Sequence, residues 1–420
     1  MMVSTALVWF RRDLRVHDHP PLRAALDAFE RVIPVFVLDD RLLDGRFESE
    51  YRSTFLFDCL NDLRTALQKR GGNLVVLRGT PERELPRLAS EHGATAAYFA
   101  SDVSPFAMAR DKRVEEALTQ AGVEPRRTPG NFIADIGKVK PYAVFTPFWR
   151  AWQQLPRGEV HGAPRTITVP SDLTVGRIPA AGRRGDQQGG ETAGRRQMLA
   201  FDPDTYKAAH NRVDQDTSRM SAYLHFGCVS ARELETRHSG AYARQLAWRD
   251  FYAHVLLRNP RNTHHAHQQQ MDAVEWDGTD EHFDAWCEGR TGFPIVDAGM
   301  RQLVKTGWMH NRARLIVASF LVKDLHFDGR RGEQFFMRYL MDGDVAQNNG
   351  NWQWISSVGV DPAPLYRRLY NPWLQQERHD PDGTYVDTWA PDSRELEPIV
   401  EHAVERKRTL EAYGRARDSA

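Results

Sequence analysis

Cysteine is scarce in this chain of 420 residues. The three cysteines, Cys59, Cys228 and Cys287, lie far apart, and no Cys-x-x-Cys motif occurs. This spacing argues against a disulfide framework. A cysteine-ligated iron–sulphur cluster is excluded as well, because it normally takes four ligands. The fold is therefore expected to rest on packed cores, and the length is sufficient for two or more domains.

Net charge and long apolar runs are absent too. Lys and Arg together number 56, as do Asp and Glu, so the formal net charge is zero. DNA-binding proteins are often basic overall, so neutrality weighs mildly against a DNA partner but leaves room for a local basic patch. No apolar run reaches membrane-spanning length, and no secretory signal is found. We expect a cytoplasmic protein without a membrane partner, and a monomer.

The first 130 residues lack the Gly-x-Gly-x-x-Gly fingerprint of ordinary dinucleotide-binding domains. What they contain is an alternation of two patterns. Apolar runs predict buried strands at 6–10, 32–38, 74–77 and 96–99. Amphipathic stretches predict helices near 50–70, 81–92 and 105–121. This alternation predicts a Rossmann-like α/β domain over residues 1–130, with a parallel sheet covered on both faces.

Charged residues stand just after three of these expected strands. They are Arg11 and Arg12, Asp39 and Asp40, and Asp102. Ligands of parallel sheets gather beyond the carboxyl ends of strands, so these residues are candidates for a binding site. The simpler interpretation is that they are ordinary loop residues.

Residues 131–199 are expected to form an interdomain linker. The window 157–196 holds eight glycines, seven arginines and four acidic residues. Such a composition cannot bury enough apolar area to order itself, so we expect a mobile loop. Attraction of this loop to phosphate is a second interpretation. Beyond residue 200 strand signals vanish and helical periodicity dominates, which predicts an all-helical domain over 200–420.

Aromatic, amide and carboxylate side chains gather in residues 307–359. Trp308, Asn311 and Leu315 have the spacing of one helical face, and Arg314 lies on the same expected helix. Further along come Asp342, Gly343, Asp344, Asn348, Trp352 and Trp354. This set suits a planar, hydrogen-bonding cofactor. A helical core with buried tryptophans is the alternative, but it explains the interleaved polar groups poorly, because unpaired polar groups are costly to bury.

Several motifs in order along the chain resemble one family. They are VWFRRDLRVHDHP (8–20), WRDFY (248–252), GRTGFPIVDAGMRQL (289–303), GWMHNR (307–312), ASFLVKDL (318–325) and NNGNWQW (348–354). Together they resemble the flavin-dependent DNA photolyases and the related cryptochromes, and most closely the class I enzymes that split cyclobutane pyrimidine dimers. The resemblance covers nearly the whole chain outside the linker, and it implies FAD as the cofactor.

The resemblance also implies which residues hold the flavin. The segment TSRMS (217–221) matches the one that cradles the flavin pyrophosphate, although its hydroxyls also suit an ordinary helix N-cap. Arg314 matches an arginine that pairs with the first carboxylate of Asp-Gly-Asp, and Asn348 matches the residue that faces the flavin N5. The implied cofactor-binding set is Tyr206, Thr217, Ser218, Arg219, Met220, Ser221, Arg314, Asp342, Gly343, Asp344 and Asn348.

UV-damaged DNA is the partner that the resemblance implies. A dimer within a duplex has to be flipped into a pocket, and Trp248 and Trp354 match the two tryptophans that wall it. The implied catalytic set is Trp248, Gln245, Asn311, Trp354 and Asn348. The implied DNA contacts are His210, Arg212, Gln245, Trp248, Arg249, Asn311 and Trp354. Further candidates for phosphate contacts, with a solvated face as the alternative, are Arg312, Arg367, Arg368 and Arg378.

Four positions depart from the best-known dimer-splitting enzymes. Gln245 replaces a glutamate, Leu315 a methionine and His210 an arginine. Gly329 replaces the middle tryptophan of a three-step electron relay, of which Trp352 and Trp276 match the two ends. Because glutamine still hydrogen-bonds and leucine still fills space, we expect weakened or adjusted repair rather than its loss.

An antenna chromophore is a further expectation from the resemblance. Arg11, Asp39 and Asp102 are expected to line its pocket in the first domain. The segment SDVSPFAMARD (101–111) resembles the branch that binds a deazaflavin. Thr263-His264 stands where the folate-binding branch carries a cysteine and a lysine, which favours deazaflavin over folate.

The expected activity is that of an enzyme, a blue-light-driven cyclobutane pyrimidine dimer photolyase. Reduced FAD donates an electron to the flipped dimer, the ring splits and the electron returns. The alternative is a cryptochrome-like photoreceptor without repair activity. The histidines His264, His265 and His267 lie in a polar stretch without a carboxylate or cysteine at ligand spacing, so no metal site is expected.

Overall fold

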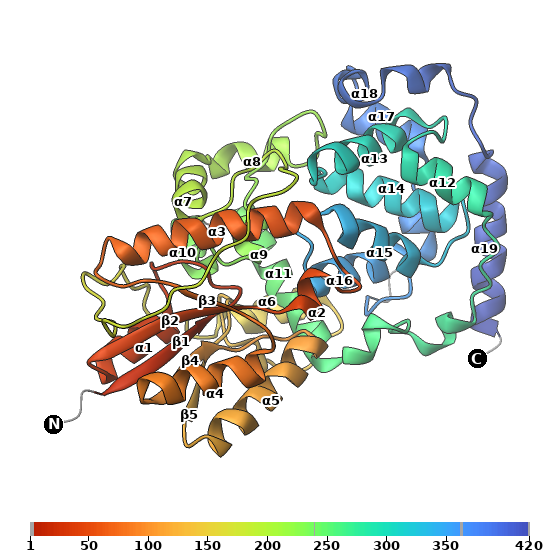
Figure 1. The fold of residues 1–420 in the computed structure, drawn as a ribbon. Helices are drawn as coiled ribbons and strands as arrows, with labels where there is room; N and C mark the ends of the chain where they lie inside the picture. The colour runs from red at the N-terminus through yellow and green to blue at the C-terminus, as the bar shows by residue number, and fades with distance from the viewer. Residues whose placement is uncertain (1–3, 239, 362–363, 419–420) are drawn as a thin grey trace. The chain divides into compact units, whose positions relative to one another are not determined.

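The structure, a computed structural model, describes residues 4–238, 240–361 and 364–418. Its contacts divide the chain into two compact units (Figure 1). The first, called the sheet unit, comprises Met1–Lys140, Trp149–Phe201 and Met220–Leu257. The second, called the helical unit, comprises Pro141–Phe148, Asp202–Arg219 and Arg258–Ala420. Each unit is therefore assembled from three separate stretches of the chain.

A parallel five-stranded sheet of order β3-β2-β1-β4-β5 forms the centre of the sheet unit. The strands are β1 (Thr5–Phe10), β2 (Arg31–Leu38), β3 (Val75–Arg78), β4 (Ala94–Ala100) and β5 (Glu124–Thr128). The first four coincide with the apolar runs, because a strand buried on both faces needs apolar side chains on both. β5 has the polar sequence EPRRT and pairs with β4 alone, so its sequence carries no such signal.

Helices cover both faces of the sheet. α4 (Pro81–His92) and α5 (Pro105–Gln120) pack Leu85, Leu88, Val114 and Leu118 against the face that carries Trp9 and its neighbours. α3 (Glu50–Gln68) lies on the opposite face (Figure 1). The other helices of the sheet unit are α1 (Pro20–Ala28), α2 (Asp40–Leu43), α7 (Glu191–Ala200), α9 (Ser221–His225), α10 (Ala231–Arg237) and α11 (Gly240–Arg258).

The glycine- and arginine-rich window is bound to the sheet unit, so the expectation of a mobile loop is wrong for residues 164–192. The amide of Ile167 donates to the Arg70 carbonyl at 2.8 Å, and the amide of Val76 donates to the Val175 carbonyl at 2.8 Å. Further along, the amide of Gly182 donates to Oγ1 of Thr54. Because the backbone groups of this segment find partners on the sheet unit, the segment needs little apolar area of its own.

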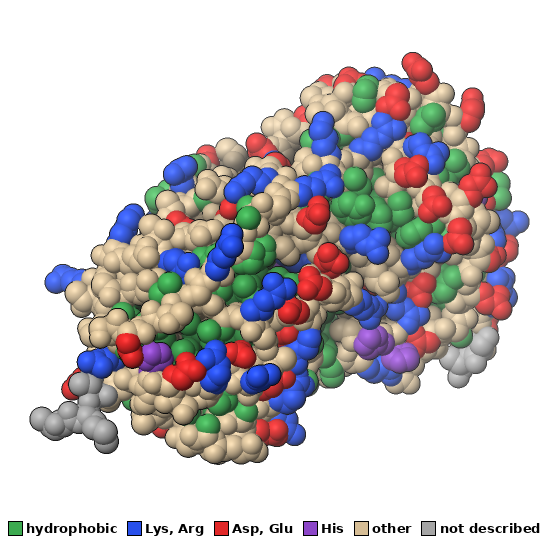
Figure 2. All heavy atoms as spheres, viewed as in Figure 1, with side chains coloured by type: hydrophobic (Ala, Val, Ile, Leu, Met, Phe, Trp, Pro, Cys, Tyr) green, Lys and Arg blue, Asp and Glu red, His purple; other side chains and the backbone are tan. Residues whose placement is uncertain are grey.

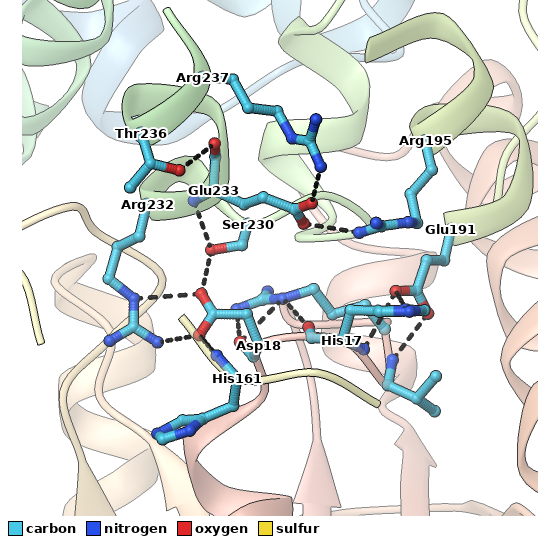
Figure 3. A network of polar contacts seen from close by, with 12 residues as sticks. His17, Asp18, His161, Glu191, Arg195, Ser230, Arg232, Glu233, Thr236 and Arg237 are labelled. Carbon is cyan, nitrogen blue, oxygen red and sulfur yellow. Dashed lines mark hydrogen bonds and ion pairs between the residues drawn. The ribbon is translucent and has the colours of Figure 1, made fainter. Parts of the chain in front are cut away.

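A buried carboxylate joins three stretches of the sheet unit (Figure 3). Asp18 is fully buried, and Nη2 of Arg232 lies 2.6 Å from its Oδ1. The hydroxyl of Ser230 and the backbone amide of His161 also donate to Asp18. In the same network Glu191, at the start of α7, accepts from the amide of Val16 at 2.7 Å. These bonds link residues 16–18, 161–191 and 230–232, and they explain why α10 belongs with the sheet.

The helical unit packs around a core of large side chains that includes Trp286, Phe293, Phe320, Phe336 and Trp352. Its longer helices are α12 (Asp280–Glu288), α13 (Pro294–Thr306), α14 (Asn311–Lys323), α15 (Gly329–Tyr339), α16 (Val345–Ile355) and α19 (His402–Asp418). Its shorter α-helices are α8 (Pro203–Ala209), α17 (Pro372–His379) and α18 (Thr384–Trp389). The residues of α6 (Phe145–Gln153) are divided between the units: those up to Phe148 belong to the helical unit and those from Trp149 belong to the sheet unit.

Acidic and basic side chains are interspersed on the face drawn in Figure 2, as the balanced composition implies. Within the part of the chain that the structure describes, none of the helices has both the length and the apolar composition that crossing a membrane requires.

Candidate functional site

A pocket in the helical unit brings together most of the polar cluster of residues 307–359. Its lining comes from helices α14, α15 and α16 and from the Asp-Gly-Asp turn between α15 and α16. The lining residues are Asn311, Arg314, Leu315, Ala318, Phe336, Leu340, Asp342, Gly343, Asp344, Gln347, Asn348, Asn351, Trp352 and Ile355. Apolar and hydrogen-bonding groups thus face one space, which is the usual make-up of a cofactor site.

The two carboxylates of the turn are fixed by different partners. Nη2 of Arg314 lies 2.8 Å from Oδ2 of Asp342, and Nε of Arg314 donates to the Met309 carbonyl. Asp344 is the N-cap of α16, and its Oδ1 accepts from the amide of Gln347 at 2.9 Å. An N-cap carboxylate is favoured there by the free amides and the helix dipole.

Asn348 and Trp352 lie one turn apart on α16 and face the pocket together. Nδ2 of Asn348 donates to the Glu333 carbonyl at 2.9 Å, so the amide oxygen is the end of this side chain that is left to accept a hydrogen bond. Such an oxygen accepts a hydrogen bond from a protonated ring nitrogen without adding charge. The sequence interpretation missed Gln347, Asn351 and Ile355. Asn351 and Ile355 lie three and seven residues after Asn348, and Gln347 lies three residues after Asp344, so helical spacing would have indicated all three.

Trp308 does not share a helical face with Asn311 and Leu315, so that expectation is wrong. α14 begins at Asn311, and His310 is its N-cap, whose Nδ1 accepts from the Arg312 amide at 3.1 Å. Burial, together with nearby cationic arginines, lowers the pKa of His310 to about 3, which keeps the ring neutral and able to accept. A helix cannot extend through its N-cap, so Trp308 lies outside α14, beneath Arg219 at 3.8 Å.

The other residues of the implied flavin set lie on two segments. Tyr206 is on α8, and its ring stacks on that of His210 with centroids 5.2 Å apart. Thr217, Ser218 and Arg219 belong to the helical unit, and Arg219 has a positive φ of 53°. Met220 and Ser221 follow, as the N-cap and first residue of α9.

The residues expected to meet DNA are partly exposed. Gln245 and Trp248 lie on α11, where Gln245 is exposed and the Trp248 ring contacts Tyr252 at 5.6 Å. Asn311 is exposed at the start of α14. Arg212 pairs with Asp214 and Asp382.

Arg368 is an exception among the expected phosphate contacts, and that expectation is wrong. Its side chain is buried, and Nη2 lies 2.6 Å from Oδ2 of Asp361. Its guanidinium lies over the ring of Trp354 at 4.4 Å. Arg368 therefore orients Trp354 rather than facing solvent.

The carboxyl ends of β1 and β4 form a second, smaller pocket, in the sheet unit. Its lining residues are Arg11, Arg12, Asp13, Ala100, Ser101, Asp102, Asn131, Phe132 and Arg249. Burial alone would raise the pKa of Asp102, but Arg12, Arg11 and Arg110 together hold it below its ordinary value. Asp39 does not line this pocket, because it caps α2 and pairs with Arg41 at 2.6 Å.

Comparison with known proteins gives matches to both parts of the chain. A family model described as DNA photolyase matches residues 6–167, and one described as the FAD-binding domain of DNA photolyase matches residues 242–415. The deoxyribodipyrimidine photo-lyase of Streptomyces griseus is 39% identical, over 98% of this chain and 95% of that relative.

Two solved structures are also similar to this chain. An archaeal photolyase from Sulfolobus tokodaii, described with two FAD molecules, has a TM-score of 0.90 at 30% identity and covers 98% of this chain and 100% of its own. A cryptochrome from Synechocystis has a TM-score of 0.89 at 26% identity, with 98% and 100% covered.

Proposed function

The chain belongs to the DNA photolyase family, and from that premise we propose that it repairs cyclobutane pyrimidine dimers in DNA under blue light, with FAD as its cofactor. The observation that carries the proposal is the pocket of the helical unit, where the Arg314–Asp342 pair, Asn348 and Trp352 face one space. Reduced FAD, when bound, supplies the electron that splits the dimer. The protein supplies binding, orientation and electrostatics.

The residues of this pocket fit a flavin. Asn348 presents an amide oxygen, which accepts from a protonated ring nitrogen and so supports the reduced cofactor. Arg314 balances the buried charge of Asp342, and Trp352 offers an aromatic edge. We assign Thr217, Ser218, Met220 and Ser221 to the pyrophosphate, because phosphates bind where backbone amides at a helix start are free. Tyr206 and Arg219 complete the assignment.

Stacking and hydrogen bonding recognise the dimer in this proposal. Trp248 and Trp354 stack on the flipped pyrimidines, each with about 1–3 kcal/mol per base. Gln245 and Asn311 hydrogen-bond the pyrimidine edges, and both are exposed. Phosphate contacts fall to Arg312 and basic residues near it, since backbone contacts supply most of the affinity for DNA. Arg249, expected to meet DNA, lines the sheet-unit pocket instead.

The sheet-unit pocket is assigned to an antenna chromophore. Arg11, Arg12 and Arg249 give it positive charge, Asp102 gives it an ionised acceptor and Phe132 gives it an aromatic wall. A deazaflavin suits this set better than a folate does. The S. tokodaii photolyase, described with two FAD molecules and with an implied novel light-harvesting cofactor, supports the proposal of a flavin-like antenna. We further place the protein in the cytoplasm, acting on DNA as a monomer.

The test is direct. The purified protein is expected to carry non-covalent FAD, to elute as a monomer, and to restore a thymine-dimer oligonucleotide under blue light after chemical reduction of the flavin. A folded protein that takes up no FAD contradicts the proposal. A flavin-loaded protein that is photoreduced but repairs nothing supports a cryptochrome-like photoreceptor instead.

A further inference from the structure

Trp352 borders two cavities. The residue lines the flavin pocket, and it also lines a cavity of about 30 Å³ together with Trp276 and Gly329. A Cβ placed on Gly329 would lie 3.5 Å from Cε3 of Trp352, so a side chain at this position would occupy the space between the two tryptophans. Glycine supplies none, and the ring of Trp276 instead contacts Tyr413 at 6.0 Å. The expected relay through position 329 therefore has no middle ring.

A different indole adjoins Trp352. The ring centroids of Trp352 and Trp286 are 6.5 Å apart at an interplanar angle of 73°, and Phe336 contacts both. Gly332 allows Trp352 to lie this close to α15, because a Cβ there would overlap its Cη2. Two indoles have similar oxidation potentials, so an electron passes from Trp286 to an oxidised Trp352 without a large uphill step.

Trp286 cannot exchange protons with solvent. It has no exposed surface, and its Nε1 donates to the Val317 carbonyl at 3.0 Å. A radical cation formed on Trp286 therefore has to be reduced by an electron from a neighbouring residue.

The aromatic contacts of Trp286 continue toward the surface. The Phe335 ring lies 5.4 Å from Trp286, and the Tyr339 ring lies 4.8 Å from Phe335. Phe335 and Tyr339 are both partly exposed. Phenylalanine is hard to oxidise and acts only as a bridge, whereas the tyrosine phenol is oxidised readily and releases its proton to water.

We propose, resting on the proposed function, that Trp352, Trp286 and Tyr339 form the electron path by which the resting flavin is photoreduced. Trp352 gives one electron to the light-excited oxidised flavin and takes one from Trp286. Trp286 takes one from Tyr339, which loses its phenolic proton to water. An external thiol returns a hydrogen atom to the tyrosyl radical, and two thiyl radicals then pair as a disulfide. Trp276, the end of the expected relay, is outside this path.

The experiment uses the whole chain loaded with FAD and compares Trp286→Phe, Tyr339→Phe and Trp276→Phe, with Trp389→Phe as a matched control. Trp389 is a partly buried tryptophan at the end of α18. Flavin absorbance under blue light with a thiol gives the photoreduction rate, and transient absorption identifies the radical. Trp286→Phe is expected to fall to about a tenth of the wild-type rate or less. Tyr339→Phe is expected to lose the tyrosyl signal, while Trp276→Phe and Trp389→Phe keep the rate.

Flavin content and repair from chemically reduced flavin are measured for every variant. These two readouts separate the electron path from the proposed function, because repair does not use the path. A flavin-loaded Trp286→Phe that is photoreduced at the wild-type rate overturns the inference. Should Trp286→Phe fail to fold, Tyr339→Phe decides, and an unchanged rate together with an unchanged radical spectrum overturns it.

Discussion

Arg314 and Asp342 form an ion pair in the wall of the cofactor pocket, with Nη2 and Oδ2 2.8 Å apart and the carboxylate side chain 2% exposed. Removal of the arginine leaves a buried charge without its partner, which costs about 3–5 kcal/mol. Arg314→Ala is therefore expected to lose most bound FAD and to unfold at lower urea. Flavin absorbance per mole of protein measures the bound FAD, and urea titration measures the stability. Arg338→Ala, exposed on α15, is the control. Wild-type FAD content in Arg314→Ala would remove this pair from the site.

Trp248 provides a test of dimer recognition. Trp248→Ala is expected to weaken binding of a thymine-dimer oligonucleotide by about 1–3 kcal/mol, the stacking energy of a base, with little change in flavin content. Fluorescence titration against damaged and undamaged DNA measures the difference, and Trp389→Ala is the control. Equal affinity of Trp248→Ala and wild type for damaged DNA would exclude the residue from the pocket.

Gln245 provides a test of the proposed dimer pocket, where it stands in place of the glutamate of the best-known dimer-splitting enzymes. The side chain is exposed on α11, so a carboxylate fits there without burial. Gln245→Glu is expected to keep or raise the repair rate, since a carboxylate accepts stronger hydrogen bonds than an amide. Ala241→Glu, one turn away and also exposed, adds the same charge and serves as the control. Complete loss of repair in Gln245→Glu alone would show that the pocket requires the amide.

Gly329 offers a gain of function. A Cβ at this position would collide first with the Ser356 hydroxyl, and its next contacts are ordinary ones at 3.5 and 3.6 Å. Gly329→Trp combined with Ser356→Ala is expected to place an indole between Trp352 and Trp276. The ring is larger than the cavity, so it displaces the neighbouring side chains. In that background Trp276→Phe should slow photoreduction, whereas it should not in wild type. No dependence on Trp276 in either background would show that the inserted ring carries no electron.

Lys323 provides a pH test of stability. It is buried beside the ring of Tyr413, and burial, aided by Arg368, lowers its pKa well below the ordinary value. Between the folded and the unfolded pKa of this lysine, the unfolded chain binds a proton that the folded chain does not. The residue therefore destabilises the fold below that pH window, and the destabilisation is lost as the pH rises through it. Lys323→Met is expected to be more stable than wild type near pH 7, with the difference shrinking as the pH rises toward the pKa of an unfolded lysine, about 10.4. Urea unfolding at several pH values measures it, and a pH-independent difference would contradict the assignment.

How far the sequence could predict this protein depended on the kind of signal each part carries. β1 to β4 are continuous apolar runs, and the Asp-Gly-Asp turn and Asn348 are close in sequence, so both the sheet and much of the pocket were foreseeable. β5 is a polar edge strand, and its partner β4 decides its conformation. Trp308 looked helical because spacing alone does not show that His310 is the N-cap and that the helix starts only after it. Trp286 was missed because its neighbours come from α15 and α16, and only the fold brings those rings together.

The Asp18 network has a consequence for dividing the chain. A fragment that ends near residue 200 keeps every strand but loses Ser230 and Arg232, which donate to the fully buried carboxylate of Asp18. An uncompensated buried charge costs several kcal/mol, a large share of the stability of a typical domain. The half of the chain that holds the sheet is therefore not a separable module, and its transplantation to another protein would have to carry residues 220–257 with it. A split version of the enzyme should instead be cut at a point that leaves Asp18, Ser230 and Arg232 in the same piece.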